Sequence, residues 1–302
     1  MKIGIIGAGA MGCLFAGLLS GTQDVKLYDV SRETVDAVNA HGVRCRESDG
    51  TERTYPVPAA LSGAAEEPAD LAILFVKDTV SRAALEGNSG LIGPETLVLS
   101  LQNGMGNLDI MEDFAPRQRL LLGTTKHNCV AEGPGVIFHS GAGVTHVGSP
   151  AGNEAAARAV AEAFQAAGIG TEICPDVDRL LWEKLFVNMT VNPVTALLGC
   201  EIGVMAEEPH ARAILESLID EAVAVAAADG QKFDPAAVKE TVLAAARALA
   251  AGRASMCQDM DRGRKTEIDF INGAVVRLGK KYGVPTPRHE LIVNLIHTKE
   301  TL

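Results

Sequence analysis

The sequence predicts a doubly wound α/β domain built on a parallel sheet, followed by a domain made only of helices. In the first half, short runs rich in Ile, Val and Leu alternate with helix-like stretches, as in a buried parallel sheet covered by helices. Beyond about residue 175, long helical stretches follow one another without strand-like runs. The 302 residues also exceed the size at which one core usually keeps growing. We therefore expect two domains, 1–174 and 175–302.

The strands of the first domain are predicted where branched apolar runs end at turn residues. They comprise 2–6, 25–29, 71–76, 96–101, 120–123 and 144–148. A hairpin is expected over 44–57, because the polar pair Asp49-Gly50 separates two extended pieces. An alanine-rich helix at 153–167 and a last strand at 169–173 complete this domain.

The second domain is predicted to consist of long helices, at 178–192, 210–229, 235–250 and 266–282. The last of them has the clearest limits. Thr266 and Asp269 resemble a capping box at its start, and Gly283 followed by Pro285 indicates its end.

Composition excludes several classes of partner. The formal net charge of -11, without clusters of Lys or Arg, argues against nucleic acid. The six cysteines form no C-x-x-C pair and show no metal-like spacing to histidine, so we expect reduced thiols and no metal site. No apolar run reaches the roughly 18 residues of a membrane span. Since Met1 leads directly into a strand-like segment, we expect a cytoplasmic protein without a signal peptide.

A glycine-rich turn follows the first predicted strand and opens a predicted helix. Gly7 permits a tight turn, Gly9 lets the backbone approach a pyrophosphate, and Gly12 permits close helix packing. The helix N-terminus attracts the phosphate charge. A turn used only for packing is the alternative. We interpret the segment as a Rossmann-type site for a nicotinamide dinucleotide, whose backbone contacts would comprise Gly7, Ala8, Gly9, Ala10, Met11 and Gly12.

Asp29 ends the second predicted strand, about 20 residues beyond the glycines, where an acid accepts hydrogen bonds from the adenosine ribose of NAD. A carboxylate there also repels the 2′-phosphate of NADP. Arg32 lies three residues further on and could offset part of this repulsion. A solvated turn carboxylate is the alternative interpretation. We expect NAD(P)H as the cofactor, with NADH favoured over NADPH by Asp29.

Two segments of the second half resemble the ketopantoate reductase (2-dehydropantoate 2-reductase) family. The stretch from Trp182 to Pro193, WEKLFVNMTVNP, is similar to the family's active-site helix, and the stretch from Ser255 to Gly273 is similar to its second signature. Further similarities lie after three predicted strands of the first half. They are Lys77, the segment Gln102-Asn103-Gly104-Met105-Gly106, and Gly123-Thr124-Thr125.

The resemblance implies an oxidoreductase of pantothenate biosynthesis that transfers a hydride from NAD(P)H to the 2-oxo carbon of ketopantoate. Lys184 would protonate the developing alkoxide, and Glu267 would orient Lys184 or contact the cofactor. Lys77 and Asn103 would lie near the nicotinamide ribose. The residues implied for substrate binding are Asn188, Asn192 and Ser255.

The spacing of the polar residues supports this interpretation independently. On a helix, Lys184 and Asn188 differ by only about 40° in direction, and Asn192 lies about 40° further round. The stripe borders the apolar residues Leu181 and Leu185, where unpaired polar groups would be costly. A neighbouring carboxylate favours the charged, proton-donating form of a lysine. An ordinary exposed lysine remains the alternative, and a dipole-favoured carboxylate near a helix start is the alternative for Glu267.

Two departures affect the substrate. The family carries further asparagines near the positions of Ile202 and Gly252, and neither side chain here can hydrogen-bond. Together with Asp29, these departures resemble NAD-dependent D-2-hydroxyacid dehydrogenases of the D-mandelate type, which act on branched 2-oxo acids. That activity is the alternative, and a non-catalytic dinucleotide sensor is a third. The expected partner is a small-molecule 2-oxo acid, and the oligomeric state stays open between a monomer and a homodimer.

Overall fold

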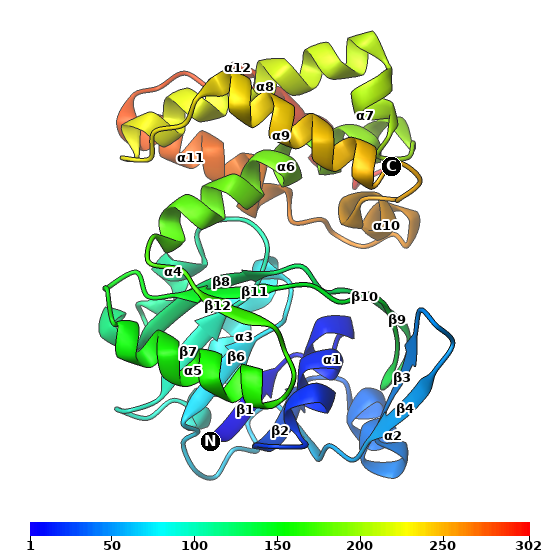
Figure 1. Cartoon of the computed structure of the whole chain (residues 1–302), viewed down its shortest axis with the longest axis vertical. Coiled ribbons are helices and arrows are strands. Elements are labelled where there is room, and N and C mark those ends of the chain that lie inside the picture. Colours follow the sequence, from blue (N-terminus) through cyan, green and yellow to red (C-terminus); the bar gives the residue numbers. More distant parts are fainter. The chain divides into compact units, whose positions relative to one another are not determined.

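All residues from 1 to 302 are described by the computed structural model, in which the chain forms two units (Figure 1). The first unit contains Met1–Gln102 and Asn107–Val177. The second contains Asp178–Leu302 together with the short loop Asn103–Gly106. The predicted α/β fold followed by helices is confirmed.

An eight-stranded sheet forms the core of the first unit, in the order β12-β11-β8-β7-β6-β1-β2-β5. The neighbouring strands β8, β7, β6, β1, β2 and β5 are parallel to one another, whereas β11 and β12 run in the opposite direction. The strands are β1 (Lys2–Ile6), β2 (Asp24–Asp29), β5 (Ala59–Leu61), β6 (Leu71–Leu74), β7 (Leu97–Ser100), β8 (Leu120–Thr125), β11 (Thr145–Gly148) and β12 (Thr171–Ile173).

The strand order of this sheet reverses at β1, which has β2 on one side and β6 on the other. In open parallel sheets, ligands bind outside the carboxyl ends of the strands at such a reversal. The helices of the unit are α1 (Ala10–Leu19), α2 (Arg32–His41), α3 (Ser81–Gly87), α4 (Asn107–Met111) and α5 (Glu154–Ala166).

A second, four-stranded sheet in the order β4-β3-β10-β9 packs against α1 in the first unit (Figure 1). Its strands are β3 (Val43–Glu47), β4 (Glu52–Tyr55), β9 (Asn128–Gly133) and β10 (Val136–Gly141). His139 of β10 contacts Glu47 at 2.7 Å and His127 at 3.0 Å, and the His127 ring lies edge-on to Phe15 of α1. The expected hairpin over 44–57 is therefore one edge of a larger sheet.

The second unit consists of helices around a core that includes Trp182, which is fully buried. Its indole Nε1 donates to Asp229 at 3.0 Å, and the Tyr282 hydroxyl donates to the other oxygen of that carboxylate at 2.7 Å. The helices are α6 (Val177–Leu198), α7 (Val204–Glu207), α8 (Pro209–Ala228), α9 (Pro235–Ala248), α10 (Ser255–Asp261), α11 (Asn272–Tyr282) and α12 (Pro287–Lys299).

The predicted helix over 266–282 is wrong in its first turn. Only Ile268–Phe270 forms a single 3₁₀ turn there, and the α-helix begins at Asn272. The Thr266 hydroxyl, expected in a capping box, donates to Glu300 and accepts only from the Ile268 N–H of this turn, at 3.3 Å. The predicted end is confirmed, because Gly283 adopts a left-handed φ of 71° and its N–H caps Gly279.

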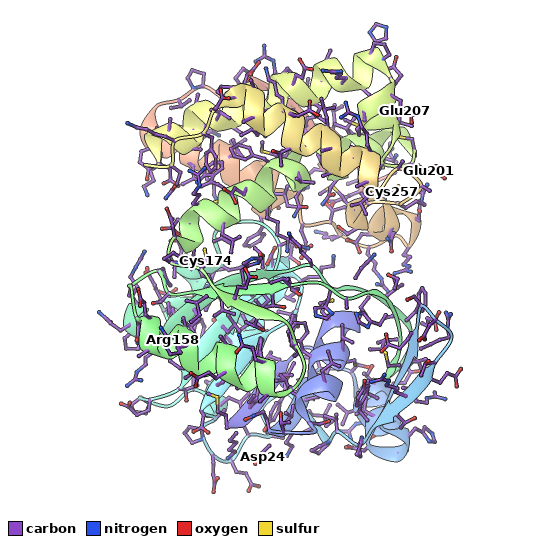
Figure 2. All side chains as sticks on the ribbon, viewed as in Figure 1. Asp24, Arg158, Cys174, Glu201, Glu207 and Cys257 are labelled. Carbon is purple, nitrogen blue, oxygen red and sulfur yellow. The ribbon has the colours of Figure 1, made fainter.

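The prediction also missed three helices of the second unit, α7, α10 and α12, and the strands β5, β9 and β10. None of the six cysteines forms a disulfide; Cys174 lies just beyond β12 and Cys257 on α10 (Figure 2). None of the helices combines the length and apolar character needed to cross a membrane.

Candidate functional site

The glycine turn of the first unit has a different spatial constraint at each glycine. Gly7 adopts a φ of 104°, which L side chains rarely adopt. A Cβ on Gly12 would lie 1.8 Å from the Gly7 carbonyl oxygen, so α1 approaches the turn too closely for any side chain. A Cβ on Gly9 would meet nothing within 4 Å. Gly7 and Gly12 are therefore required by the turn itself, whereas Gly9 leaves an open approach to the backbone.

The start of α1 suits a phosphate group. Gly9 is the N-cap, and no side chain caps the first N–H groups. The helix dipole favours negative charge at this end. The open side of Gly9 coincides with these N–H groups, so the turn fits the pyrophosphate of a dinucleotide.

Asp29 lies at the carboxyl end of β2 and is held by the backbone on both sides. One carboxylate oxygen accepts from the Ala8 N–H at 2.6 Å, and the other accepts from the Ser31 N–H at 2.8 Å. Asp29 thereby fixes both the glycine turn and the start of α2. Each oxygen keeps a second acceptor position, so the carboxylate can still accept a ribose hydroxyl. The neighbouring Arg32 is exposed.

Lys77 lies in the exposed segment after β6, which a buried amide network supports. The Gln102 side chain donates to the Val76 carbonyl at 2.7 Å and to the Ser81 hydroxyl at 2.8 Å. Asn107 extends the network and donates to Asp78 at 2.6 Å. Beyond its place in a family segment, the Gln102 side chain fixes the backbone that presents Lys77.

Asn103 belongs to the loop Asn103–Gly106, which packs on the second unit. The Met105 N–H donates to the Phe270 carbonyl at 2.8 Å, and Arg277 donates to the Met105 carbonyl at 3.2 Å. Gly104 has a φ of 83°, and a Cβ there would lie 2.4 Å from the Phe270 carbonyl oxygen. The loop that carries Asn103 is thus joined to the segment that carries Glu267.

The polar stripe predicted on 178–192 lies on α6. Lys184 and Asn188 are half-buried, and Asn192 is buried with 7% of its surface exposed. Within the same helix, Pro193 lacks an N–H and cannot donate to the Met189 carbonyl four residues earlier. Asn272 supplies the missing donor at 2.9 Å. Because of the proline, a carbonyl of α6 is available to accept a hydrogen bond from Asn272 at the start of α11.

Glu267 is buried, with 7% of its surface exposed, and lies directly before the 3₁₀ turn Ile268–Phe270. The prediction that it occupies the first turn of a long helix is wrong, because α11 starts five residues later. Hydrogen bonds from Asn272 to α6 and from Met105 to Phe270 hold the residues that follow Glu267. Ser255, the first residue of α10, is exposed.

Sequence reasoning missed Asn272 and His289 as residues that organise this site. Asn272 is fully buried and also donates to His289 Nδ1 at 3.1 Å. His289 Nε2 donates in turn to the Leu218 carbonyl of α8 at 3.0 Å. Burial lowers the pKa of His289, in agreement with this neutral tautomer. Asn272 lies inside the second family segment, Ser255 to Gly273, and this membership was the only available signal for it.

The two family positions without asparagine lie together. The Ile202 N–H donates to the Gly252 carbonyl at 3.0 Å, and a Cβ on Gly252 would lie 3.4 Å from the Ile202 side chain. Ile202 is buried, with 8% of its surface exposed. At the two positions near which the family carries asparagines, this chain therefore has an apolar side chain and a glycine without any side chain.

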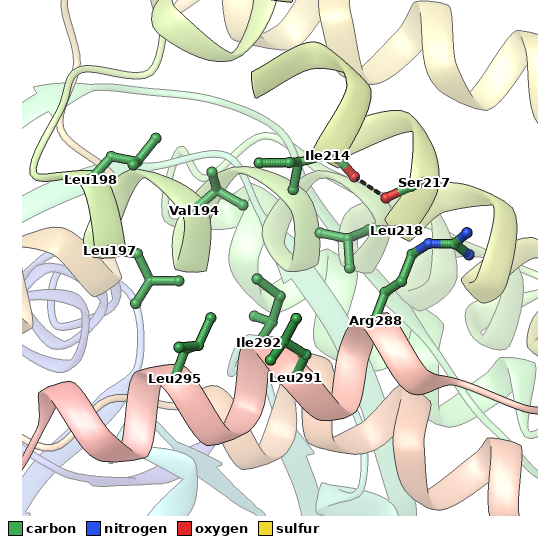
Figure 3. A pocket seen from close by; sticks show the side chains of 10 residues that line it. All are labelled: Val194, Leu197, Leu198, Ile214, Ser217, Leu218, Arg288, Leu291, Ile292 and Leu295. Carbon is green, nitrogen blue, oxygen red and sulfur yellow. Dashed lines mark hydrogen bonds between the residues drawn. The ribbon is translucent and has the colours of Figure 1, made fainter. Parts of the chain in front are cut away.

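An open apolar pocket of about 370 Å³ lies between α6, α8 and α12 in the second unit (Figure 3). Two polar residues line this pocket. The Ser217 hydroxyl donates to the Ile214 carbonyl, and the Arg288 guanidinium pairs with Glu221 at 3.2 Å. Val194 of this pocket is two residues from Asn192, which places it about 200° round the helix from the polar stripe. Apart from Ser217 and Arg288, the pocket is lined by apolar side chains.

Family models match both halves of the chain. The model described as ketopantoate reductase PanE/ApbA matches residues 3–152, and the model described as its C-terminal part matches residues 176–300. This chain belongs to the ketopantoate reductase family. The 2-dehydropantoate 2-reductase of Halobacterium salinarum is 33% identical over 300 residues, covering 98% of each chain. That of Pyrococcus horikoshii is 32% identical over 304 residues, covering 100% of this chain and 98% of its own.

Solved structures of the family show the same fold. The ternary structure of D-mandelate dehydrogenase with NADH and anilino(oxo)acetate matches with a TM-score of 0.93 at 32% identity, covering 100% of this chain and 99% of that one. The putative 2-dehydropantoate 2-reductase from Enterococcus faecalis matches with a TM-score of 0.80 at 32% identity, covering 100% and 98%.

The geometry of the glycine turn predicts different effects for two similar substitutions. Gly12→Ala should destabilise the first unit, because its Cβ would clash with the Gly7 carbonyl. Gly9→Ala should leave the melting temperature unchanged but weaken NADH binding about tenfold or more, since its methyl group would occupy the open approach. Gly21→Ala is the matched control, because a Cβ there also meets nothing within 4 Å. Calorimetric titration and thermal unfolding test this, and normal NADH binding by Gly9→Ala would contradict the assignment.

Proposed function

We propose that this protein is an NAD(P)H-dependent 2-oxo acid reductase that converts ketopantoate to pantoate. The observation that carries the proposal is the stripe of Lys184, Asn188 and Asn192 on α6, in a chain whose two halves both match the family. An ammonium group and two amides on one side of a partly buried helix suit an anionic, oxygen-rich substrate. Residues 1–174 would bind the dinucleotide, and 175–302 would carry the substrate and the proton donor.

The cofactor would be held by the turn from Gly7 to Gly12, with Asp29, Lys77 and Asn103 contacting its riboses. Bound NAD(P)H supplies the hydride for the 2-oxo carbon. Lys184 would donate a proton to the oxygen of that carbon, which prevents negative charge from accumulating on it. Glu267, which is buried, would hold the Lys184 ammonium in its charged form and in the right direction.

The substrate would be oriented by side chains of the second unit. Asn188 and Asn192 would hydrogen-bond its carboxylate and hydroxyl oxygens, and Ser255 at the start of α10 would contribute a hydroxyl. The amide network of Gln102 supports the Lys77 segment, so that this ammonium is presented on a fixed backbone. The family match and the common side of Lys184, Asn188 and Asn192 on α6 support these roles.

A second candidate activity is that of a D-2-hydroxyacid dehydrogenase acting on branched 2-oxo acids. It is supported by the adjoining positions of Ile202 and Gly252, which provide no amide for the terminal hydroxyl of ketopantoate. The match to D-mandelate dehydrogenase agrees with it. A purely non-catalytic sensor would have no use for the polar stripe on α6.

The first test is turnover by the wild-type protein and by Lys184→Ala. With ketopantoate, NADH or NADPH should be oxidised, and Lys184→Ala should lower kcat about 100-fold or more while NADH still binds. The exposed Lys232→Ala is the control and should keep normal turnover. A panel of branched 2-oxo acids, with D-mandelate in the reverse direction, ranks the two activities by kcat/KM. Near-normal turnover by folded Lys184→Ala would remove this lysine from the mechanism.

Cofactor choice should follow from Asp29. The carboxylate is fixed by the N–H groups of Ala8 and Ser31, so it cannot easily turn away from a 2′-phosphate. One unfavourable charge contact at partial burial is worth about 1.4 kcal/mol, a tenfold preference for NADH. Asp29→Ser should reduce the kcat/KM ratio of NADH to NADPH by about that factor. Arg32→Ala, which removes the neighbouring exposed cation, should raise the ratio. If the wild-type protein prefers NADPH, the proposed role of Asp29 in selecting NADH is wrong.

We also propose that two copies associate through the apolar pocket of α6, α8 and α12 (Figure 3). Leu198, Ile214, Leu291 and Leu295 of this face are large hydrophobic residues with 41–59% of their surface exposed. Contiguous exposed apolar surface marks an interaction site. Arg288 of the pocket is paired with Glu221, so the pocket has no uncompensated positive charge that would attract an anionic partner. A second copy of this chain presents the same leucines and can form a symmetric apolar contact.

Light scattering after size exclusion tests the homodimer. We expect a dimer for the wild type and a monomer for the double variant Leu291→Glu with Leu295→Glu, because buried carboxylates would oppose association. Leu249→Glu is the control, since this leucine is 56% exposed on another surface. A monomeric wild type would exclude the interface. We also propose that the enzyme is cytoplasmic, a compartment in which cysteines such as its six stay reduced.

A further inference from the structure

The C-terminal end of α12 contacts both segments that carry the proposed catalytic residues. Lys299 donates to the carbonyls of Ala196 and Leu197 at the end of α6, at 2.6 and 3.0 Å. The Glu300 carboxylate accepts from the Thr266 N–H at 2.8 Å and from its hydroxyl at 2.6 Å. Thr266 directly precedes Glu267. The end of α12 therefore fixes the residue on one side of that carboxylate.

His297 extends this contact to the other side of Glu267. Its Nδ1 lies 3.1 Å from the second oxygen of Glu300, and its Nε2 lies 3.0 Å from Asp269, two residues beyond Glu267. A neutral imidazole has only one N–H, so only the imidazolium can donate to both carboxylates. The complete contact therefore exists only in the protonated form.

The charges around His297 favour that form. Partial burial lowers the pKa of His297, but hydrogen bonds to Glu300 and Asp269 outweigh it and raise the pKa above the ordinary value. Burial likewise opposes ionisation of Glu300, yet its bonds from Thr266 and His297 lower its pKa. The cations nearby are engaged elsewhere, Lys299 with α6 and Arg277 with the carbonyls of Asp269 and Met105.

Further charged groups on α12 are paired with other elements. Arg288 bonds to Glu221 of α8, and Glu290 bonds to Lys280 of α11. Both lie toward the N-terminal end of the helix, about 10 Å or more along its axis from His297. The two carboxylates are therefore the charged groups that face His297.

We propose that protonated His297, together with Glu300, is a pH-sensitive clamp that positions Glu267 for proton donation by Lys184. This inference rests on the proposed function. The clamp is present below the raised pKa of His297 and is lost as the pH rises through it. When the His297 ring is neutral, one of its nitrogens carries a lone pair that faces the carboxylate of Glu300 or Asp269. The hydrogen bond to that carboxylate is then lost, so Glu267 is held less firmly on one side.

The experiment compares kcat and KM of the wild type, His297→Gln and Glu300→Gln over about pH 6 to 9. The wild type should lose kcat in a first step as the pH rises through the raised pKa of His297. His297→Gln should have a kcat about tenfold lower at pH 6 and lack the first step. The KM for NADH should change less than twofold, because the glycine turn is intact. His210→Gln, an exposed histidine on α8, is the control with a wild-type profile.

A second readout is independent of turnover. The imidazole resonance of His297 and the amide resonance of Thr266 should titrate together in the wild type. Glu300→Gln should lower the pKa of His297 and uncouple the two resonances. If the protein reduces no 2-oxo acid, the proposed function fails while this titration still reports on the clamp. A His297→Gln protein that keeps the wild-type first step, or a Thr266 amide that ignores His297, would overturn the clamp.

Discussion

The hydrogen bond from Asn272 to the Met189 carbonyl is the interaction on which the site of the second unit depends. It exists because Pro193 leaves that carbonyl without its helical donor. Met189 is flanked by the polar stripe of α6, and Asn272 begins the helix that follows Glu267. One side-chain amide thus joins the helix of the proposed proton donor to the segment of the carboxylate that would orient it.

This arrangement has a cost in stability. The Oδ1 of Asn272 is buried and has no hydrogen-bond partner, and such a group costs about 1–3 kcal/mol. The amide is nevertheless held by bonds to Met189 and His289, and His289 continues the connection to α8. A buried polar chain of this kind fixes one arrangement of helices more narrowly than apolar packing would.

The first unit is constrained by close backbone contact. Gly12 allows α1 to approach the Gly7 carbonyl, and Asp29 ties the turn to the end of β2. Both features lie at the carboxyl edge of the sheet, where the strand order reverses at β1. Spacing along the chain was enough to predict the first strand, the glycine turn and α1, because these three are contiguous in sequence.

The second unit was less predictable because its decisive contacts join distant segments. The spacing of Lys184, Asn188 and Asn192 predicts their common side on α6, but no local pattern shows that Thr266 bonds to Glu300, 34 residues away. Glu300 accepts from the Thr266 hydroxyl and N–H, and the same hydroxyl accepts from the Ile268 N–H at 3.3 Å, but only the single turn Ile268–Phe270 follows it. The helix therefore begins only at Asn272, whose own side chain is held by α6.

The helix α12 was also not predicted, because its decisive contacts again join distant segments. Its apolar residues are partly exposed, as at Leu291 and Leu295, so the helical periodicity of a buried face is weak. Its fixed end comes instead from polar contacts to α6 and to the Glu267 segment. The end of α12 can thus determine how the two segments with the proposed catalytic residues are held, because charged hydrogen bonds specify direction where apolar contact does not.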